Sequence, residues 1–261
     1  MNHNTTATRS PVIVRPVGHA QLRNMALALS TLLDCIEADE ASPRLGIFYG
    51  FSGYGKSIGA AFATARTGSA YIEAKSIWTQ RSLLEAIAEE LGIIRPAPTG
   101  PKMLRQIIDE LNRSPRALII DEMDYLVKKH MVDIIRDIHD ATPIAIMMIG
   151  EEALPAKLKE WERFDNRILV ATAAEACGPD DALKLRDHYC TMVTLTDDLA
   201  LHFQERCKGV TRRIVVNLQE AQRAAAAEGA AQIDLKWWGK RSVRNGDIPT
   251  RRSMSFTGGR S

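Results

Sequence analysis

The segment Leu45–Ser57, LGIFYGFSGYGKS, is a short apolar run that breaks into a glycine-rich loop closed by Lys-Ser. Four of its residues fill the spacing G-x-x-x-x-G-K-[ST] of a phosphate-binding loop: Gly50, Gly55, Lys56 and Ser57. The alanine-rich stretch 58–66 favours a helix, so strand, loop and helix follow in the order that this motif requires. We therefore predict a nucleotide site built on this loop.

The loop also predicts how ATP or ADP is held. Its glycines, including the extra Gly53, let backbone N–H groups turn inward as a nest for phosphate oxygens, next to a helix N-terminus. Lys56 is expected to reach the β- and γ-phosphates, and the Ser57 hydroxyl to ligate Mg²⁺. The predicted nucleotide contacts from this segment are Gly50, Phe51, Ser52, Gly53, Tyr54, Gly55, Lys56, Ser57 and Ile58.

A second part of the site is predicted at the end of residues 116–122, RALIIDE. Apolar residues running into two acids are typical of a buried parallel strand that delivers carboxylates to the edge where ligands bind. We expect Asp121 to hold Mg²⁺ together with Ser57, and Glu122 to orient and polarise the water that attacks the γ-phosphate. The chain is thus predicted to be an ATPase.

Apolar runs alternate with helical patterns up to about residue 177, which predicts an α/β fold with a parallel sheet and helices on both faces. After Gly178-Pro179 the patterns are helical only, which predicts a small second domain. We expect four parts: a disordered or extended arm (1–18), a nucleotide-binding α/β domain (19–177), a helical lid domain (178–235) and a basic flexible tail (236–261).

Composition indicates a globular protein with a sizeable core, since 45% of the 261 residues are apolar. No apolar stretch approaches the roughly 20 residues of a membrane span, and the first residues lack the pattern of a secretory signal. We therefore expect a cytoplasmic protein without a membrane partner. The four cysteines lack the spacing of a metal site and are expected to be reduced thiols.

Positive charge is concentrated at one end of the sequence. Residues 236–261 contain seven basic side chains and one acid, a net charge of +6, whereas the whole chain carries only +2. Such a segment on a mildly acidic body suggests an approach to a polyanion. A solvated tail without a partner is the other interpretation.

Two arginines are predicted to complete the site. Arg167 precedes a predicted strand at the edge of the core, where its guanidinium could reach the γ-phosphate of a neighbouring subunit, with Arg163 as its competitor. A surface salt bridge is the alternative interpretation. Arg212 opens a helix of the lid domain and could fold back onto the nucleotide, with Arg213 as the alternative.

With these residues assembled, the chain resembles the AAA+ ATPases over about residues 15–230. The Gly209-x-x-Arg212 spacing matches the second sensor of that superfamily. Within it, the chain is similar to the transposition regulators typified by phage Mu protein B and the TnsC and TniB proteins. The narrower resemblance rests on the stretch 71–92, on Met148-Ile149-Gly150-Glu151 and on the spacing Phe164-x-x-Arg167.

The resemblance implies an AAA+ P-loop NTPase core with a small C-terminal α-helical lid, assembled as a ring or helical filament on double-stranded DNA. The segment after the second strand faces DNA in that family, so it implies sequence-independent contacts from Lys75, Trp78, Thr79 and Arg81. A packed Trp78 with solvated charges is the alternative. Where the family has a small polar first sensor, this chain has residues 148–151, MIGE, which implies slow hydrolysis.

The leading functional hypothesis is an ATP-dependent, oligomerising DNA-binding ATPase that captures target DNA and stimulates a transposase. DNA and the transposase would in turn stimulate ATP hydrolysis. One alternative is an AAA+ ATPase of a secretion, assembly or replication-loader system. Another is a small-molecule kinase, which the Asp-Glu pair and the helical lid disfavour.

Overall fold

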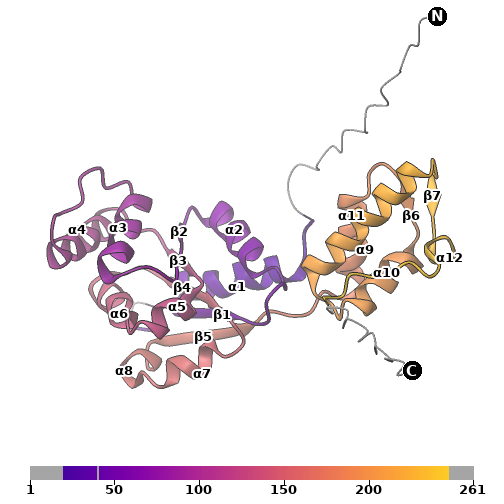
Figure 1. Cartoon of the computed structure of the whole chain (residues 1–261). Coiled ribbons are helices and arrows are strands. Elements are labelled where there is room, and N and C mark those ends of the chain that lie inside the picture. Colours follow the sequence, from indigo (N-terminus) through magenta and orange to yellow (C-terminus); the bar gives the residue numbers. More distant parts are fainter. Residues whose placement is uncertain (1–19, 40, 247–261) are drawn as a thin grey trace, which may run out of the picture.

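A five-stranded parallel sheet is the central feature of the computed structural model (Figure 1). Its strands are β1 (Leu45–Tyr49), β2 (Ala70–Glu73), β3 (Leu118–Asp121), β4 (Ile146–Gly150) and β5 (Ile168–Ala173). They lie in the order β2-β3-β4-β1-β5, and every neighbouring pair is parallel. The structure describes residues 20–39 and 41–246, so the expected arm at 1–18 lies outside the described residues.

Helices cover both faces of this sheet. One face is covered by α3 (Gln80–Glu90), α4 (Gly100–Arg113), α5 (Met123–Lys128), α6 (Val132–Ala141), α7 (Leu154–Lys159) and α8 (Glu162–Asp165). The other face is covered by α1 (Arg23–Ile36) and α2 (Lys56–Thr67). The predicted fold class, a parallel sheet flanked by helices, is confirmed.

The three central strands β1, β3 and β4 are buried on both faces, which explains why they are continuous apolar runs in the sequence, whereas the edge strand β5 alternates between partly buried and exposed residues. Because side chains alternate along a strand, Ile47 and Met148 pack on the side of α3 to α8, whereas Phe48 and Met147 pack on the side of α1 and α2. All four side chains are fully buried. The sheet therefore separates two apolar cores and holds the carboxyl ends of its strands at one edge.

A second, smaller domain of helices follows the sheet and forms a separate lobe in Figure 1. Strand β5 ends at Ala173, and α9 (Pro179–Tyr189) begins six residues later in a new core with α10 (Asp197–Arg206) and α11 (Thr211–Ala227). A short parallel ladder of β6 (Thr194–Leu195) with β7 (Gln232–Ile233) and the helix α12 (Leu235–Trp238) complete it. We call this unit the lid domain.

The structure differs from the tail that the sequence predicted to begin at residue 236. Trp238 is 2% exposed and packs edge-on against Phe203, with ring centroids 5.0 Å apart. Arg241 lies over the ring of Trp237, 4.1 Å from its centroid. Two adjacent tryptophans bury enough apolar surface to hold this segment on the lid domain. The sequence prediction considered only the charge of the segment and therefore missed this effect. Residues 247–261, the rest of the expected tail, lie outside the described residues.

Candidate nucleotide site

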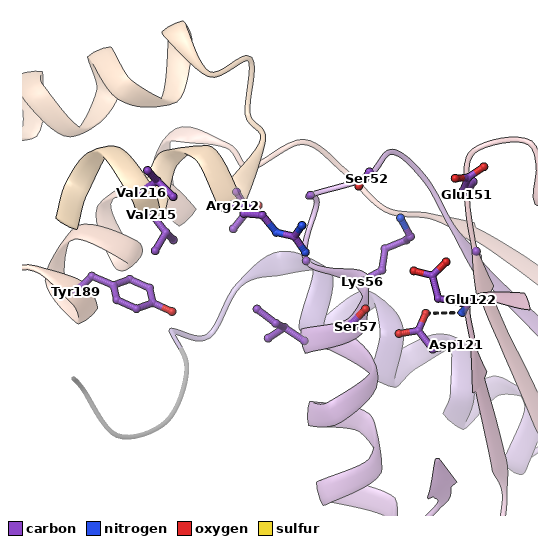
Figure 2. A pocket seen from close by; sticks show the side chains of 15 residues that line it. Ser52, Lys56, Ser57, Asp121, Glu122, Glu151, Tyr189, Arg212, Val215 and Val216 are labelled. Atoms are coloured by element: carbon purple, nitrogen blue, oxygen red, sulfur yellow. Dashed lines mark hydrogen bonds between the residues drawn. The ribbon is translucent and has the colours of Figure 1, made fainter. Parts of the chain in front are cut away.

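The predicted phosphate loop joins β1 to α2 and forms one wall of a cavity of about 310 Å³ (Figure 2). Gly53 and Gly55 have φ angles of 86° and 85°, in the left-handed region that glycine adopts without strain. Gly53 also meets the lid domain closely, since a Cβ there would lie 2.7 Å from Val210 Cγ1. The loop therefore needs its glycines for backbone conformation and for contact with the lid.

Lys56 stands at the first position of α2 and lines the cavity. Its Nζ donates hydrogen bonds to the carbonyl oxygens of Gly50 at 2.6 Å and Phe51 at 3.0 Å. Burial lowers the pKa of Lys56, an effect that nearby carboxylates, Asp121 and Glu122 first among them, oppose. The ammonium is thus held by acceptors that phosphate oxygens can replace.

Asp121 is the last residue of β3 and is 3% exposed. One carboxylate oxygen accepts the backbone N–H of Glu122 at 2.8 Å, and the other accepts the Tyr71 hydroxyl at 3.1 Å. Burial, together with the neighbouring Asp121, raises the pKa of Tyr71, so its hydroxyl stays a donor. Tyr71 was not predicted as a site residue, because its link to Asp121 depends on the pairing of β2 with β3.

Glu122 precedes α5 with a φ of 57°, a conformation that is uncommon for residues other than glycine. It lines the cavity beside Lys56, and Figure 2 shows its carboxylate close to that of Asp121. Burial, followed by the charge of Asp121, raises the pKa of Glu122. The unusual backbone conformation turns this side chain toward the cavity at the end of the sheet.

The lid domain supplies the opposite wall. Arg212 lies in the first turn of α11; its backbone N–H donates to Gly53 O at 3.2 Å, and Figure 2 shows its guanidinium extending toward the phosphate loop. Tyr189, Val215 and Val216 form an apolar surface beside it, which sequence reasoning missed. The sequence offered one indication that this surface lies at the site: both valines follow Arg212 on the same predicted helix. Arg213, the alternative, does not line this cavity and lies against Gly246.

The structure separates the other predicted loop residues into two groups. Ser52, Ser57 and Ile58 line the cavity. Gly50, Phe51 and Tyr54 do not line it: the Tyr54 carbonyl accepts a bond from buried Asn24, and the Phe51 ring packs edge-on against that of Tyr54. Asn24 also bonds the backbone of Glu175, so the loop is tied both to α1 and to the segment leading into the lid domain.

The end of β4 completes the cavity on the side of Glu122. Gly150 and Glu151 line it, at the position where the sequence lacks a small polar first sensor. Asp124 accepts the backbone N–H of Glu151 at 2.7 Å and forms an ion pair with Lys157 of α7 at 2.6 Å. A charged pair, which was not predicted, therefore lies beside the expected catalytic acid.

The two arginines proposed for a neighbouring subunit differ in their surroundings. Arg167 pairs with Asp140 of the same chain, with N–O distances of 2.5 and 2.6 Å, and also bonds the Arg163 carbonyl. This pairing lowers the pKa of Asp140. Arg163 is exposed, and its guanidinium has no ion pair among the described residues. The geometry of Arg167 thus matches the salt-bridge interpretation. Arg163 is the one of the two whose guanidinium has no ion pair to give up among the described residues.

The four residues expected to contact DNA all have partners within the chain. Lys75 pairs with Glu73 at 2.6 Å, and Arg81 with Glu85 at 2.7 Å. Thr79 caps α3 by accepting the backbone N–H of Ser82, while Trp78 is half-buried against the core. The pairs of Lys75 and Arg81 are exposed and weak enough to exchange for phosphates. Ile77, 85% exposed between them, was not predicted.

Residues 20–39 and 41–246 contain no helix that is long and apolar enough to cross a membrane. The same part of the chain contains no cluster of three or more His, Cys, Asp or Glu side chains suited to a metal. All four cysteines are free thiols, and burial raises the pKa of Cys35, Cys177 and Cys190 to about 12. The expected reduced thiols are therefore not activated nucleophiles.

Comparison with known proteins supports the predicted fold. Residues 39–158 match the family model of the AAA domain. With the five-stranded parallel sheet and its phosphate loop, this match gives the chain the fold of an AAA+ P-loop NTPase, as predicted. AAA domains are nucleotide-hydrolysing modules in general. Comparison with curated proteins finds no match.

Several solved structures share this fold. The ADP form of the Aeropyrum pernix ORC2 protein has a TM-score of 0.65 at 18% identity over 84% of this chain and 67% of that one. The Aeropyrum pernix ORC1 protein in complex with DNA has a TM-score of 0.57 at 20% identity, over 85% and 63%. Cdc6p from Pyrobaculum aerophilum has a TM-score of 0.57 at 13% identity, over 86% and 66%. The chain spans about two thirds of the length of each.

Proposed function

We propose that this protein binds ATP with Mg²⁺ in the cavity between the sheet and the lid domain and hydrolyses it. One observation carries the proposal: five polar side chains from three separate elements line that cavity, namely Lys56, Ser57, Asp121, Glu122 and Arg212. They supply a cation for the phosphates, oxygen ligands for a metal, a carboxylate that can act as general base toward the attacking water, and a cation from the lid. The test is nucleotide affinity and phosphate release of the full chain; failure to bind ATP would contradict the proposal.

The residues fit a magnesium ion. Ser57 offers an exposed hydroxyl at the start of α2, and Asp121 offers a carboxylate at the end of β3. Each Asp121 oxygen accepts one hydrogen bond in the structure, which leaves lone pairs free for a hard cation. When bound, the metal would neutralise charge on the phosphate oxygens.

The remaining roles follow from position. Lys56 would exchange its two carbonyl acceptors for phosphate oxygens. Glu122, held at the end of the sheet by its left-handed backbone, would orient the attacking water and accept its proton. Arg212 would couple nucleotide binding to the position of the lid domain. Its backbone N–H is hydrogen-bonded to the phosphate loop, and its helix α11 belongs to the lid domain.

We further propose that hydrolysis requires a second copy of the chain. Arg212 is the one arginine among the described residues that lines the cavity, so an additional transition-state cation would come from another subunit. Arg163 suits this role better than Arg167, whose guanidinium is already paired with Asp140. A ring or filament of copies would provide such interfaces.

Mixing variants tests this arrangement. Arg163→Ala should bind ATP normally and hydrolyse it at least about 1,000-fold more slowly, the lower end of the range expected for such an arginine. Mixing it with Glu122→Gln should restore part of the activity at interfaces that combine an intact Glu122 with an intact Arg163. Arg167→Ala serves as the comparison. Absence of rescue despite verified co-assembly, or rescue only with Arg167→Ala, would reject Arg163 as the trans-acting residue.

We also propose that the assembled protein binds duplex DNA without sequence preference. Three observations support this: the sequence resemblance to transposition regulators, the fold shared with a protein solved in complex with DNA, and the exchangeable surface pairs of Lys75 and Arg81. Contacts to phosphates position a protein without reading bases. Binding should therefore weaken as salt concentration rises.

Salt titration of DNA binding distinguishes contacts made by the AAA+ core from contacts made by the C-terminal end of the chain. Each lost phosphate contact should reduce the slope of log K against log salt by about 0.9, so Lys75→Ala and Arg81→Ala should each flatten it by roughly one unit per protomer. The matched chain ends after Gly246, which keeps buried Trp238 and removes Arg251, Arg252 and Arg260. Loss of the salt dependence in the shortened chain alone would locate DNA binding in the tail.

In its most specific form, the proposal is that this ATPase captures target DNA and delivers it to a transposase. This form of the proposal rests on the sequence resemblance. A replication-loader role is the second candidate, favoured by the fold shared with ORC and Cdc6 proteins. If the first candidate is correct, strand transfer by a cognate transposase should increase only when this protein, ATP and DNA are all present. Loading of a helicase under the same conditions would favour the second candidate.

A further inference from the structure

The phosphate end of the proposed site contains an excess of acids. Burial lowers the pKa of Lys56, and four carboxylates lie close enough to oppose this effect: Asp121, Glu122, Asp124 and Glu151. The γ-phosphate of ATP would bring more negative charge to the same place, whereas ADP would bring less. A site that favours ATP therefore needs a cation at this end besides Lys56.

Asp124 is the most tightly held of the acids that are not expected to act in the reaction. Its side chain is 12% exposed; one oxygen accepts the Glu151 backbone N–H at 2.7 Å, and the other accepts Lys157 Nζ at 2.6 Å. Gly150 lies directly against it, since a Cβ there would be 2.4 Å from Asp124 Oδ2. The carboxylate is thus fixed between α5, α7 and the end of β4.

Lys157 reaches this place from α7. Its Nζ is also 3.9 Å from Glu151 Oε2, so it neutralises two of the four acids. A second cavity, lined by Glu122, Asp124, Glu151 and Lys157 among others, shares Glu122 and Glu151 with the nucleotide cavity. The lysine therefore lies on the side of Glu122, the proposed general base, where the chain lacks a small polar first sensor.

We propose that Lys157 is a positioning residue that makes the site selective for ATP over ADP by neutralising Asp124 and Glu151 beside the γ-phosphate. This inference rests on the proposed ATP-binding function. Without Lys157, the partly buried Asp124 would keep an uncompensated charge that repels the γ-phosphate. The β- and α-phosphates, held by Lys56 and the loop, would be less affected.

The experiment compares the affinities of a non-hydrolysable ATP analogue and of ADP, each with Mg²⁺, for the full chain. Lys157→Met should weaken binding of the analogue about tenfold and that of ADP less than about twofold, since charge interactions fall with distance. Lys157→Arg should retain the wild-type ratio. Lys159→Met, an exposed lysine on the same helix, is the matched control.

The double variant Asp124→Asn with Lys157→Met removes both charges and keeps an oxygen that can accept the Glu151 N–H. It should recover most of the ATP selectivity, because the partly buried charge of Asp124 is gone and the carboxylate that remains, Glu151, is 68% exposed and screened by solvent. Equal weakening for both nucleotides would show a purely structural role, and an unchanged ratio in Lys157→Met would also overturn the inference. If the wild-type chain bound neither nucleotide, the proposed function itself would fail.

Discussion

Lys56→Ala is expected to abolish ATP binding at micromolar nucleotide, because it removes the phosphate-loop cation from a site crowded with carboxylates. Loss of one partner of a hydrogen-bonded, partly buried charge pair costs about 2 to 5 kcal/mol. That range corresponds to a loss of affinity of roughly 30-fold or more. ADP binding should fall as well, since Lys56, at the start of α2, is expected to reach the β-phosphate as well as the γ-phosphate. Calorimetry of both nucleotides measures the effect.

The folding of this variant is expected to be intact. Lys56 donates hydrogen bonds to two carbonyl oxygens of its own loop, and its removal leaves the two apolar cores of the sheet untouched. The matched control is Lys102→Ala, an exposed lysine on α4. An affinity within about twofold of the wild type in Lys56→Ala would remove the phosphate-binding role from this loop.

Glu122→Gln is expected to keep nucleotide binding and to lose hydrolysis by about 100- to 10,000-fold, the range of a positioned general base. The amide has the same shape as the carboxylate, so it preserves the backbone conformation before α5 but cannot accept the proton of the attacking water. Removing one of four acids should, if anything, strengthen ATP binding. Phosphate release measured beside nucleotide affinity separates the two effects.

Glu152→Gln is the control for that experiment, because this acid is exposed and does not line the cavity. It should hydrolyse ATP at the wild-type rate. Unchanged turnover in Glu122→Gln would transfer the catalytic role to another group, and Glu151, which also lines the cavity, would be the next residue to test.

The parts of the site that could be predicted are local in sequence. Lys56 and Ser57 follow the glycines of one loop, and Asp121 and Glu122 end one apolar run, so each motif carries its own evidence. The residues that were missed act across the fold. Tyr71 meets Asp121 because β2 pairs with β3, and Lys157 meets Asp124 across 33 positions of sequence.

The same reason explains the differences at Arg167 and Trp238. Arg167 was interpreted by its place before a strand, but its partner Asp140 lies 27 positions earlier, on α6's end, and no sequence pattern links them. The start of the tail was predicted from the concentration of basic residues. In the structure, the contact of Trp238 with Phe203 keeps the beginning of that segment packed on the lid domain. In both cases a contact between distant residues outweighs the local pattern.

The sequence by itself determined the fold class, the phosphate loop and the two acids at the end of β3, because periodicity and spacing are properties of neighbouring residues. Only the tertiary structure decided the strand order β2-β3-β4-β1-β5, which places β1 between β4 and β5 and brings Gly150 beside the loop. It also decided the apolar wall of the lid and the pairing of Lys157 with Asp124. These contacts depend on burial and pairing between segments far apart in the chain, which only the folded arrangement specifies.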